Sequence, residues 1–465
     1  MTDTYKIERA KILELLKNKN IKIFFSGIGG ISMSAIAAAL MQKNYKVGGS
    51  DIVDGDAVKK LRSIGAEIFI SHKAENIDGY DLFVYTSRIK EDNPEMLRAR
   101  ENGIPVIKRA QMLGALMSEY KKSIGVTGTH GKSSTTAMIS EIFMQANTDP
   151  TFFIGAIYPP VNSAYKIGTG DYFILESDEY ADSFLNLPPD IALILNIEMD
   201  HPDYFTDLDA VITAFKKYLA ITSELAVINA DDKNSLEAVK DFEKKILTYS
   251  IEAPADIRAK NIAYIEGFPA FDIYAHGALY ASVQLSVPGD FNIYNALASA
   301  SVAYSCGISG DAVTRGLNAF KGASRRFDYK GEFNGVKVYD DYSHHPTELK
   351  KMLEAMQNVT KNNIWCVFQP HTYSRTNELK TELCEVLTEY SNSDRTKIIL
   401  TEIYSATEEN TYDICSEDIA NETDCGFISD FNDIADYLKK QCADGDIVIL
   451  AGAGNVTEIT GMVLS

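Results

Sequence analysis

One short segment constrains the fold of this chain more than any other: a glycine-rich run between an apolar strand pattern and a helical pattern. It reads Gly-Val-Thr-Gly-Thr-His-Gly-Lys-Ser-Ser over residues 125–134. Glycines let backbone N–H groups close around phosphate oxygens, while a lysine ammonium and a serine hydroxyl serve the outer phosphates and a magnesium ion. Val126 stands where the usual spacing has glycine, so this is a variant loop, and the alternative is a tight turn with a solvated lysine.

The chain alternates short β-branched or aromatic runs with helical patterns from residue 21 onward, which is typical of a parallel sheet. Its 465 residues are enough for about three domains at ~150 residues each. Alternating patterns at 245–287 predict a small antiparallel sheet, and a polar, glycine-bracketed connection occupies 322–331. We therefore predict an α/β fold with a Rossmann-like N-terminal domain, a central P-loop ATPase-like domain with an added antiparallel sheet, and a Rossmann-like C-terminal domain. The predicted bounds are 1–121, 122–324 and 325–465.

Bulk charge and hydropathy exclude several classes of protein. Lys and Arg total 45 against 65 Asp and Glu, and the net charge of −20 would repel a nucleic-acid backbone. The first residues lack the pattern of a signal peptide, and no run of ~18 apolar residues occurs, so we expect a cytoplasmic protein without membrane insertion. The six cysteines have no paired C-x-x-C spacing, which predicts reduced thiols and no zinc site.

A second glycine turn follows the first strand pattern. It contains Gly29, Gly30 and Ser32, and Asp51 ends the next strand about 20 residues later. Glycines here allow a diphosphate to approach a helix N-terminus, and the carboxylate is suited to ribose hydroxyls. A nicotinamide cofactor and a UDP-linked ligand use the same physics, so the turn alone leaves both open.

Two acidic segments follow strand patterns of the middle region. One begins Glu-Ser-Asp-Glu at Glu176, and the other ends in Asp200-His201. The carboxyl ends of parallel strands form the ligand crevice, and magnesium prefers the carboxylate oxygens found there. A histidine is a less usual magnesium ligand. The alternative is a solvated acidic loop in which Asp200 caps a helix.

The last third of the chain has two further polar segments after strand patterns. Tyr342 and His344 lie in Asp-Asp-Tyr-Ser-His-His-Pro, and Arg375 lies in Gln-Pro-His-Thr-Tyr-Ser-Arg. Histidines beside a fixed arginine suit a carboxylate or a charged intermediate. Each segment taken singly would more often be a surface or capping feature.

Taken together and in order, the motifs of this chain resemble those of the Mur ligases of peptidoglycan synthesis. They are Gly-x-Gly-Gly, Gly-Thr-His-Gly-Lys-Ser, Glu-x-Asp-Glu, Asn-Ile-Glu-x-Asp-His, Arg-Arg-Phe, Asp-Asp-Tyr-x-His-His-Pro-Thr-Glu and Phe-Gln-Pro-His. The resemblance covers about residues 22–460, and the last two motifs discriminate best. Within the family it is strongest to the member whose partners are UDP-N-acetylmuramate, L-alanine and ATP.

The resemblance implies a three-domain ligase that uses ATP to activate the muramate carboxylate as an acyl phosphate, which the amine of L-alanine then attacks. It implies Mg²⁺, with Mn²⁺ as a substitute. A carboxylate repels the γ-phosphate, so cations must neutralise both groups in the transition state.

The resemblance also assigns roles to individual residues. ATP would be held by Gly128, Thr129, His130, Gly131, Lys132, Ser133, Ser134, Asn292, Asn295, Arg326 and Asp341. The metal would be held by Ser133, Glu176 and His201. The UDP-sugar would lie against Gly29, Gly30, Ser32 and Asp51, and the amino acid against Tyr342, His344 and Arg375. The catalytic groups would be Lys132, His201, His344 and Arg375.

Some positions depart from the family pattern. Phe291 stands where histidine is common, Ala181 where aspartate is usual, and Thr372 where arginine is frequent. Some relatives carry a carbamylated lysine near Lys216 or Lys217, and this branch is expected to lack it.

Three alternatives to the L-alanine ligase stay open. A ligase of the same family that recycles a murein tripeptide would share the ATP site and differ in the C-terminal pocket. A nucleotide-binding protein without ligase activity would retain the loop alone. A nicotinamide oxidoreductase would rest only on the first glycine turn.

Overall fold

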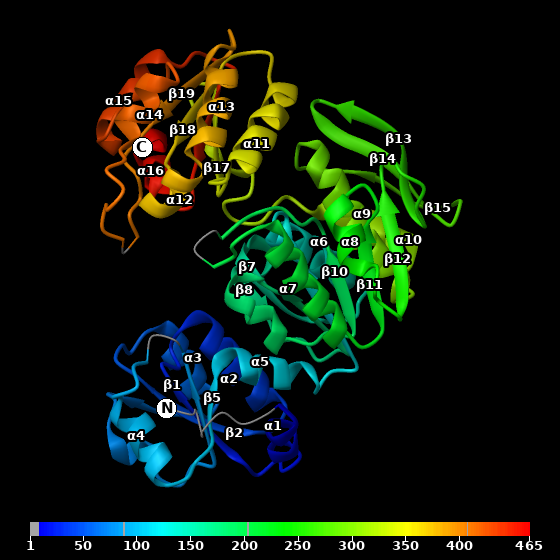
Figure 1. The fold of residues 1–465 in the computed structure, drawn as a ribbon, viewed down its shortest axis with the longest axis vertical. Coiled ribbons are helices and arrows are strands. Elements are labelled where there is room, and N and C mark those ends of the chain that lie inside the picture. Colours follow the sequence, from blue (N-terminus) through cyan, green and yellow to red (C-terminus); the bar gives the residue numbers. More distant parts are fainter. Residues whose placement is uncertain (1–8, 87–88, 202–203, 407) are drawn as a thin grey trace.

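The computed structural model describes residues 9–86, 89–201, 204–406 and 408–465, and it contains three sheets that follow one another along the chain (Figure 1). Their strands lie within residues 22–108, 122–284 and 328–451. Helices alternate with parallel strands in each of the three sheets, which confirms the predicted α/β class. The division after residues 121 and 324 stays a prediction. Among the described helices, none has the length and apolar character needed to cross a membrane.

The N-terminal sheet is fully parallel, with strand order β3-β2-β1-β4-β5. Its strands are β1 (Lys22–Ser26), β2 (Lys46–Asp51), β3 (Glu67–Ile70), β4 (Leu82–Tyr85) and β5 (Val106–Lys108). Its helices are α1 (Arg9–Leu16), α2 (Ile31–Gln42), α3 (Asp56–Ser63), α4 (Pro94–Glu101) and α5 (Arg109–Met117), with a 3-10 turn, η1, at Ala74–Ile77. The order reverses at β1, and ligands of open parallel sheets bind at such a reversal. The glycine turn between β1 and α2 lies there.

The central sheet has ten strands, in the order β15-β14-β13-β12-β11-β10-β6-β9-β7-β8. They are β6 (Lys122–Thr127), β7 (Thr151–Tyr158), β8 (Ser163–Lys166), β9 (Tyr172–Glu176), β10 (Ile191–Ile194), β11 (Leu225–Asn229), β12 (Lys245–Ser250), β13 (Ile257–Ile265), β14 (Phe268–Ala275) and β15 (Ala278–Gln284). The helices are α6 (Lys132–Gln145), α7 (Leu208–Ile221), α8 (Lys233–Val239), α9 (Asp290–Ser305) and α10 (Gly310–Ala319). Short 3-10 segments are η2 (Pro159–Val161) and η3 (Tyr180–Asn186).

The predicted antiparallel region begins later than its sequence pattern indicated. β13 pairs antiparallel with β14, and β14 with β15, but β12 pairs parallel with β11 and β13. Strands β13, β14 and β15 extend the edge of the same sheet that contains the parallel strands. Alternation of apolar and polar residues indicates that one face of a strand is exposed, but it does not indicate whether the neighbouring strand runs parallel or antiparallel. The prediction that residues 245–250 belong to the antiparallel sheet is therefore wrong.

The C-terminal sheet has strand order β16-β17-β21-β18-β19-β20, and only the β16–β17 pair is antiparallel. Its strands are β16 (Asp328–Phe333), β17 (Val336–Asp341), β18 (Ile364–Phe368), β19 (Thr396–Leu400), β20 (Gly426–Phe427) and β21 (Ile447–Ala451). Its helices are α11 (Pro346–Val359), α12 (Tyr373–Glu378), α13 (Lys380–Ser391), α14 (Ser416–Glu422), α15 (Phe431–Gln441) and α16 (Ile459–Leu464), preceded by the 3-10 turn η4 (Val456–Glu458). The expected polar connection at 322–331 runs into β16.

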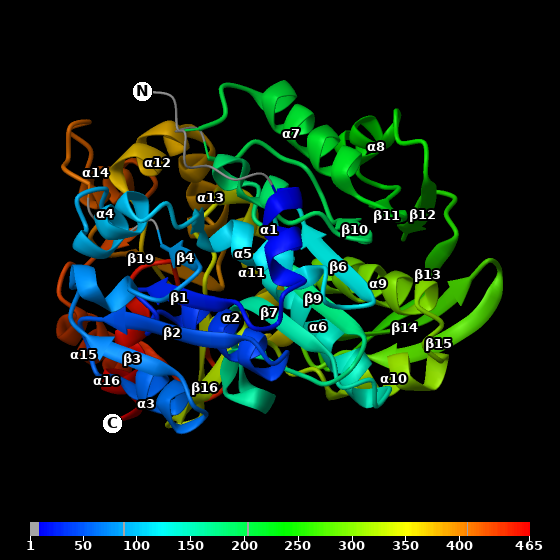
Figure 2. The same cartoon turned by 90° about the horizontal axis from the view of Figure 1, so that it is seen from below.

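The buried cores join the first two domains more closely than the third. Phe173, Leu175 and Leu187 of the central region belong to the same buried cluster as Leu113 and Leu116 of α5. The N-terminal and central elements therefore lie packed side by side, as Figure 2 shows from below. The main C-terminal cluster takes in only Phe291 from the described residues before 325.

Candidate active site

The phosphate-binding loop predicted from the sequence connects β6 to α6. Gly131 caps α6 in a left-handed conformation, with φ of 87°, and Gly128 has φ of 137°. A Cβ on Gly131 would lie 2.7 Å from Oδ1 of Asn295, and one on Gly128 would lie 3.0 Å from the carbonyl oxygen of Asn196. Both positions therefore require glycine, because any larger residue meets strain as well as a clash. The loop exposes the N-terminus of a 14-residue helix, which favours anions.

Lys132, the first residue of α6, points its ammonium at acidic groups. Its Nζ donates to Oε2 of Glu179 at 2.8 Å and to the carbonyl oxygen of Gly128 at 2.8 Å. Burial alone would lower the pKa of Lys132, but the carboxylates of Glu179 and Asp178 outweigh it and raise the pKa. The lysine is thus a fixed positive charge beside the loop, available to a phosphate that displaces the carboxylate.

The three predicted metal ligands fall into two groups. Ser133 donates from Oγ to Oε2 of Glu176 at 2.8 Å, so these two lie together. His201 lies instead with Asp178 and Glu179, and the three can each offer one ligand atom within 4.8 Å of the others. Burial raises the pKa of Glu179 to about 7. Carboxylate and hydroxyl oxygens suit Mg²⁺, and both groups border the same cavity.

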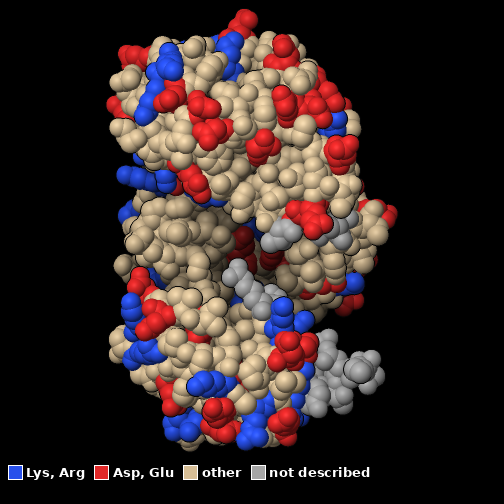
Figure 3. Space-filling model, turned by 90° about the vertical axis from the view of Figure 1, so that its left-hand side faces the viewer, with Lys and Arg blue, Asp and Glu red and all other residues tan. Residues whose placement is uncertain are grey.

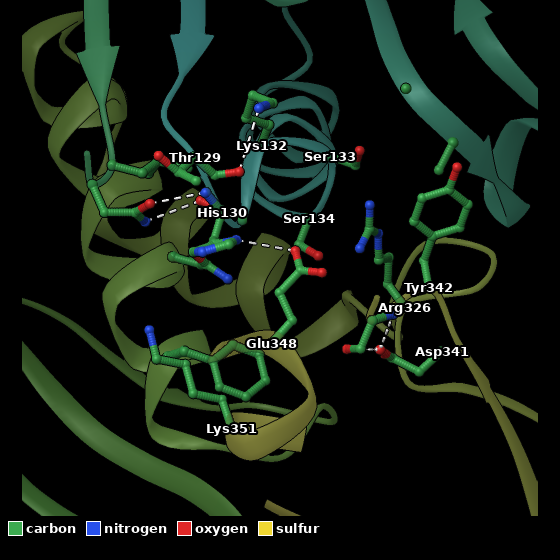
Figure 4. Close-up of a pocket in the computed structure, with 18 of the residues that line it drawn as sticks. Thr129, His130, Lys132, Ser133, Ser134, Arg326, Asp341, Tyr342, Glu348 and Lys351 are labelled. Atoms are coloured by element: carbon green, nitrogen blue, oxygen red, sulfur yellow. Dashed lines mark hydrogen bonds and ion pairs between the residues drawn. The ribbon is translucent and has the colours of Figure 1, made fainter. Parts of the chain in front are cut away.

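His130 connects the phosphate loop to the C-terminal domain. Its Nδ1 lies 3.1 Å from Oε1 of Glu348 on α11, and its Nε2 lies 3.3 Å from Oε2 of Glu198. Figure 4 shows the imidazole and the Glu348 carboxylate pointing toward one another. Burial would lower the pKa of His130, but the two carboxylates raise it to about 9, and contact with the histidine lowers the pKa of Glu198 to about 2. The imidazolium is held between acids from two domains.

Arg375 makes a second contact between the same two domains. Its guanidinium donates to Oδ1 of Asp200 at 3.0 Å and approaches Nδ1 of His201 at 3.3 Å. Burial would raise the pKa of Asp200, but Arg375 outweighs it and lowers the pKa to about 2. His201 itself has φ of 54°, a left-handed conformation that few non-glycine residues adopt. The C-terminal domain therefore contacts the loop that follows β10 of the central sheet.

His344 lies beside this contact with its side chain largely buried. Its Nδ1 donates to the carbonyl oxygen of Tyr342 at 3.1 Å, which leaves Nε2 as the acceptor. Burial lowers the pKa of His344 to about 4, so the imidazole is neutral at pH 7. The ring of His371 is 5.7 Å away. A neutral histidine and the Arg375 guanidinium are together suited to an amine and a carboxylate.

Asp341 anchors the segment that links the central and C-terminal domains. Its Oδ2 accepts from the backbone N–H of Phe327 at 2.8 Å, and its Oδ1 accepts from the N–H and hydroxyl of Ser343. Burial raises the pKa of this carboxyl. The guanidinium of Arg326 lies 4.7 Å from the ring centre of Tyr342. Asp341 borders the cavity while its oxygens hold backbone donors.

The two asparagines assigned to ATP lie in the first turns of α9. Asn292 donates to the carbonyl oxygen of Pro288 at 2.7 Å, and Asn295 donates to Oδ1 of Asn292 at 3.0 Å. Phe291, which replaces the common histidine, stacks on Phe327 with ring centres 5.6 Å apart. The phenylalanine at position 291 therefore forms an apolar contact between α9 and the segment that precedes β16.

These elements enclose a cavity of about 750 Å³. Of the residues assigned to ATP, metal and amino acid, it is lined by Thr129, His130, Gly131, Lys132, Ser133, Ser134, Glu176, His201, Asn292, Asn295, Arg326, Asp341, Tyr342, His344 and Arg375. Figure 3 shows a hollow on the adjoining face of the molecule, with acidic side chains inside it. Gly128 belongs to the loop but lies outside this lining. The four residues assigned to the UDP-sugar also lie outside it, in the N-terminal domain.

The N-terminal glycine turn has a different chemistry. The N–H of Gly29 donates to Oδ2 of Asp51 at 2.8 Å, so this carboxylate holds the turn itself. Arg109, the first residue of α5, donates to Oγ of Ser32 at 2.8 Å and brings a cation to the start of α2. Ile31 and Ile52 leave 71% and 72% of their surfaces exposed beside the turn. A cation next to apolar surface suits a nucleoside diphosphate.

Glu179, Glu198 and Glu348 were recognised only as members of quoted motifs, without roles of their own. The contact of Asp200 with Arg375 and the position of Arg109 were not singled out from the sequence. Glu348 had a local signal, because it stands three residues after the helix cap His345 in a capping box. The others act through partners distant in sequence.

The remaining flagged positions lie away from the cavity lining. Lys216 pairs with Glu237 at 3.3 Å, and Lys217 is exposed on α7. Thr372 immediately precedes α12 and has φ of 59°. All six cysteines are free in the structure.

Comparison with protein-family models covers most of this sequence. The Mur ligase family, catalytic domain, matches residues 22–121; the Mur ligase middle domain matches 126–303; and the Mur ligase, glutamate ligase domain, matches 325–454.

Similar proteins extend over nearly the full length. The UDP-N-acetylmuramate–L-alanine ligase of Clostridium tetani is 42% identical over 94% of this chain and 96% of its own. That of Caldanaerobacter subterraneus is 41% identical over 96% and 98%. Among solved structures, UDP-N-acetylmuramate-alanine ligase from Thermotoga maritima has a TM-score of 0.74 at 26% identity, covering 96% of this chain and 98% of that one. A murein peptide ligase from Psychrobacter arcticus shares the fold, with a TM-score of 0.66 at 23% identity over 96% and 98%.

Proposed function

This chain belongs to the Mur ligase family, and from that premise we propose that it joins L-alanine to the carboxylate of UDP-N-acetylmuramate at the expense of ATP. Curated relatives at about 41% identity over most of the chain bear the name of that activity. One structural observation carries the proposal: a phosphate loop and a pocket containing His344 and Arg375 border the same cavity. The cytoplasm, which supplies ATP, is the proposed location.

The proposed reaction has two steps. An oxygen of the muramate carboxylate attacks the γ-phosphorus of ATP, the bond to the β-phosphate oxygen breaks, and an acyl phosphate and ADP form. The alanine amine then attacks the acyl carbon, the amine loses a proton, and inorganic phosphate leaves. Lys132 and the N-terminus of α6 stabilise the charge on the transferring phosphoryl group, because they are fixed before the reaction begins.

We propose Mg²⁺ as the metal, with Mn²⁺ able to replace it. Ser133 and Glu176 would hold an ion near the phosphate loop, and His201 with Asp178 and Glu179 would hold one on the carboxylate side. The donors are mainly carboxylate and hydroxyl oxygens, which fits these hard cations. When bound, the ion would neutralise phosphate charge and draw the two negatively charged substrates together.

The amino-acid pocket is proposed on the C-terminal side of the cavity. Arg375 would bind the alanine carboxylate in exchange for part of its contact with Asp200. Nε2 of His344, left as an acceptor by the bond from Nδ1 to Tyr342, would accept a hydrogen bond from the amine. Its low pKa keeps the imidazole neutral, so it does not repel an ammonium group.

The UDP-sugar is proposed to lie along the N-terminal glycine turn, with its diphosphate at Gly30 and Ser32 and near Arg109. The muramate end would then extend toward the cavity of the central domain. The turn serves a UDP-linked ligand in this arrangement, and a nicotinamide cofactor has no place in the proposed reaction.

The decisive experiment measures phosphate release from ATP with UDP-N-acetylmuramate and Mg²⁺, with the product identified by mass. L-alanine, glycine, L-serine, the murein tripeptide and no amine are compared. Strong dependence on L-alanine is expected. Dependence on the tripeptide would instead identify the recycling ligase, and no product with any amine would favour a nucleotide-binding protein that does not ligate.

A further inference from the structure

Glu348 lies at the junction between the phosphate loop and the amino-acid pocket. Its Oε1 lies 3.1 Å from Nδ1 of His130 in the loop. Its Oε2 lies 3.3 Å from the backbone N–H of His344 and 3.4 Å from Nδ1 of the same residue. One carboxylate on α11 therefore contacts both substrate regions, which lie on different domains.

Two further features fix this carboxylate in place. Glu348 completes the capping box of α11 with His345, so its backbone and side chain are both ordered by the helix start. On the far side, His130 is held by Glu198 at 3.3 Å, and its backbone N–H donates to Oδ1 of Asn196 at 2.8 Å. His130 therefore connects Glu348 to residues that flank the phosphate loop.

The Glu348 side chain is only 17% exposed, and that of His130 is 10% exposed. Breaking a largely buried charge pair is costly because the remaining partner stays unpaired away from water. The contact therefore has a strong preference for one arrangement of the two domains.

We propose that Glu348 is a positioning residue that couples the phosphate loop to the amino-acid pocket, by holding His130 with one carboxylate oxygen and the His344 segment with the other. The inference rests on the proposed function for the identity of the two substrates. A nucleotide that binds the phosphate loop favours the conformation in which Glu348 contacts both His130 and His344. An amino acid bound at His344 stabilises the same conformation of the loop. Such coupling is reciprocal for binding free energies.

The test is a double-mutant cycle with Glu348→Gln and His130→Gln, with Glu354→Gln as the control. Glu354 lies on the same helix but is exposed. Each single variant is expected to lower kcat about 100-fold, since a misplacement of ~1 Å at a reacting centre costs roughly that factor. The kcat of the double variant is expected to be no lower than that of the less active single variant, because both substitutions remove the same contact. The KM for UDP-N-acetylmuramate should stay unchanged.

A binding measurement separates this inference from the proposed function. Calorimetric titration of L-alanine with and without the non-hydrolysable ATP analogue AMP-PNP gives a coupling factor in the wild-type protein, and that factor should fall to about one in Glu348→Gln. A wild-type protein that binds both ligands cooperatively but forms no product would refute the ligase assignment and leave the coupling intact.

Three outcomes would overturn the inference. Additive losses in the double variant would mean that the two side chains act separately. A lower melting temperature with unchanged kcat and coupling would reduce Glu348 to a helix cap. Should Glu348→Gln fail to fold, His130→Gln carries the test, since it leaves the helix cap untouched, and unchanged coupling in that variant would equally overturn the proposal.

Discussion

Two glycine-rich turns in this molecule have the same local architecture and yet present different charges to a phosphate. After β6, the helix starts with Lys132, whose ammonium is surrounded by carboxylates. After β1, the helix starts with Ile31, which is 71% exposed, and a cation at the turn, Arg109, comes from α5. Under the proposed function the difference corresponds to two tasks: the turn after β6 would stabilise charge that develops during a reaction, and the turn after β1 would hold a diphosphate that does not change.

The sharpest test of this comparison is Lys132→Ala. We expect turnover to fall by about 10³-fold or more, because a fixed cation at a transferring phosphoryl group contributes on that scale. Steady-state phosphate release measures the effect, with circular dichroism to show that the fold is retained. Lys240→Ala, at an exposed lysine, is the control. Near-normal turnover in Lys132→Ala would remove the distinction between the two turns.

The central loop is also tied to the C-terminal domain through His130, and this tie should depend on pH. The pKa of His130 is raised from 6.5 to about 9 by its contacts with Glu198 and Glu348. The contribution of these contacts to the free energy of unfolding is therefore complete below pH 6.5 and is lost as the pH rises through 9. The contribution is at most about 3 kcal/mol. Calorimetric unfolding of wild type and His130→Gln at pH 6.5, 8 and 10 should show a difference that shrinks with pH. A constant difference would contradict the charged pair.

The metal prediction concerns only the central loop. Glu176→Ala should raise the Mg²⁺ concentration for half-maximal activity about 30-fold, because it removes a carboxylate from the ion and leaves Ser133 without its partner. A magnesium titration at saturating ATP provides the measurement. An unchanged titration curve would refute the role of Glu176, whereas a change in His201→Ala alone would assign the metal to the group with Asp178 and Glu179.

The smallest effect is expected at the N-terminal turn. Arg109→Ala should raise the KM for UDP-N-acetylmuramate about 10-fold and leave kcat and the KM for ATP unaltered, because a charge-assisted contact to a spectator diphosphate is lost. Initial-rate kinetics with each substrate varied in turn separate these constants. A large loss in kcat would show that this turn, too, acts in the transition state.

Much of the fold could be predicted, because it depends on local patterns. Helix α2 (Ile31–Gln42) and the strands around both glycine turns follow the alternation of apolar runs and helical patterns that the sequence indicated from residue 21 onward. The resemblance to Mur ligases is confirmed by the family models. The parallel pairing of β12 was missed because the periodicity of a strand is the same in parallel and antiparallel sheets.

The candidate site could be predicted only in part. Glycines, Lys132 and the paired histidines are visible in the sequence because their spacing is local. The contact between His130 and Glu348 spans 218 positions and exists only once two domains close, so no local pattern could reveal it. The same holds for Arg375 and Asp200, 175 positions apart. The assigned site residues stay predictions until the variants above are measured.

The buried cluster shared by α5 and the central sheet has a consequence for how the protein can be dissected. Cutting the chain near residue 121 would remove the contact of Leu113 and Leu116 with Phe173 and Leu175. Both fragments would then expose a hydrophobic surface to solvent. Severing it near residue 324 leaves each fragment with its interior almost whole. We therefore expect the first two thirds to be obtainable as one independent piece, and the last third as another, whereas the N-terminal domain by itself should aggregate.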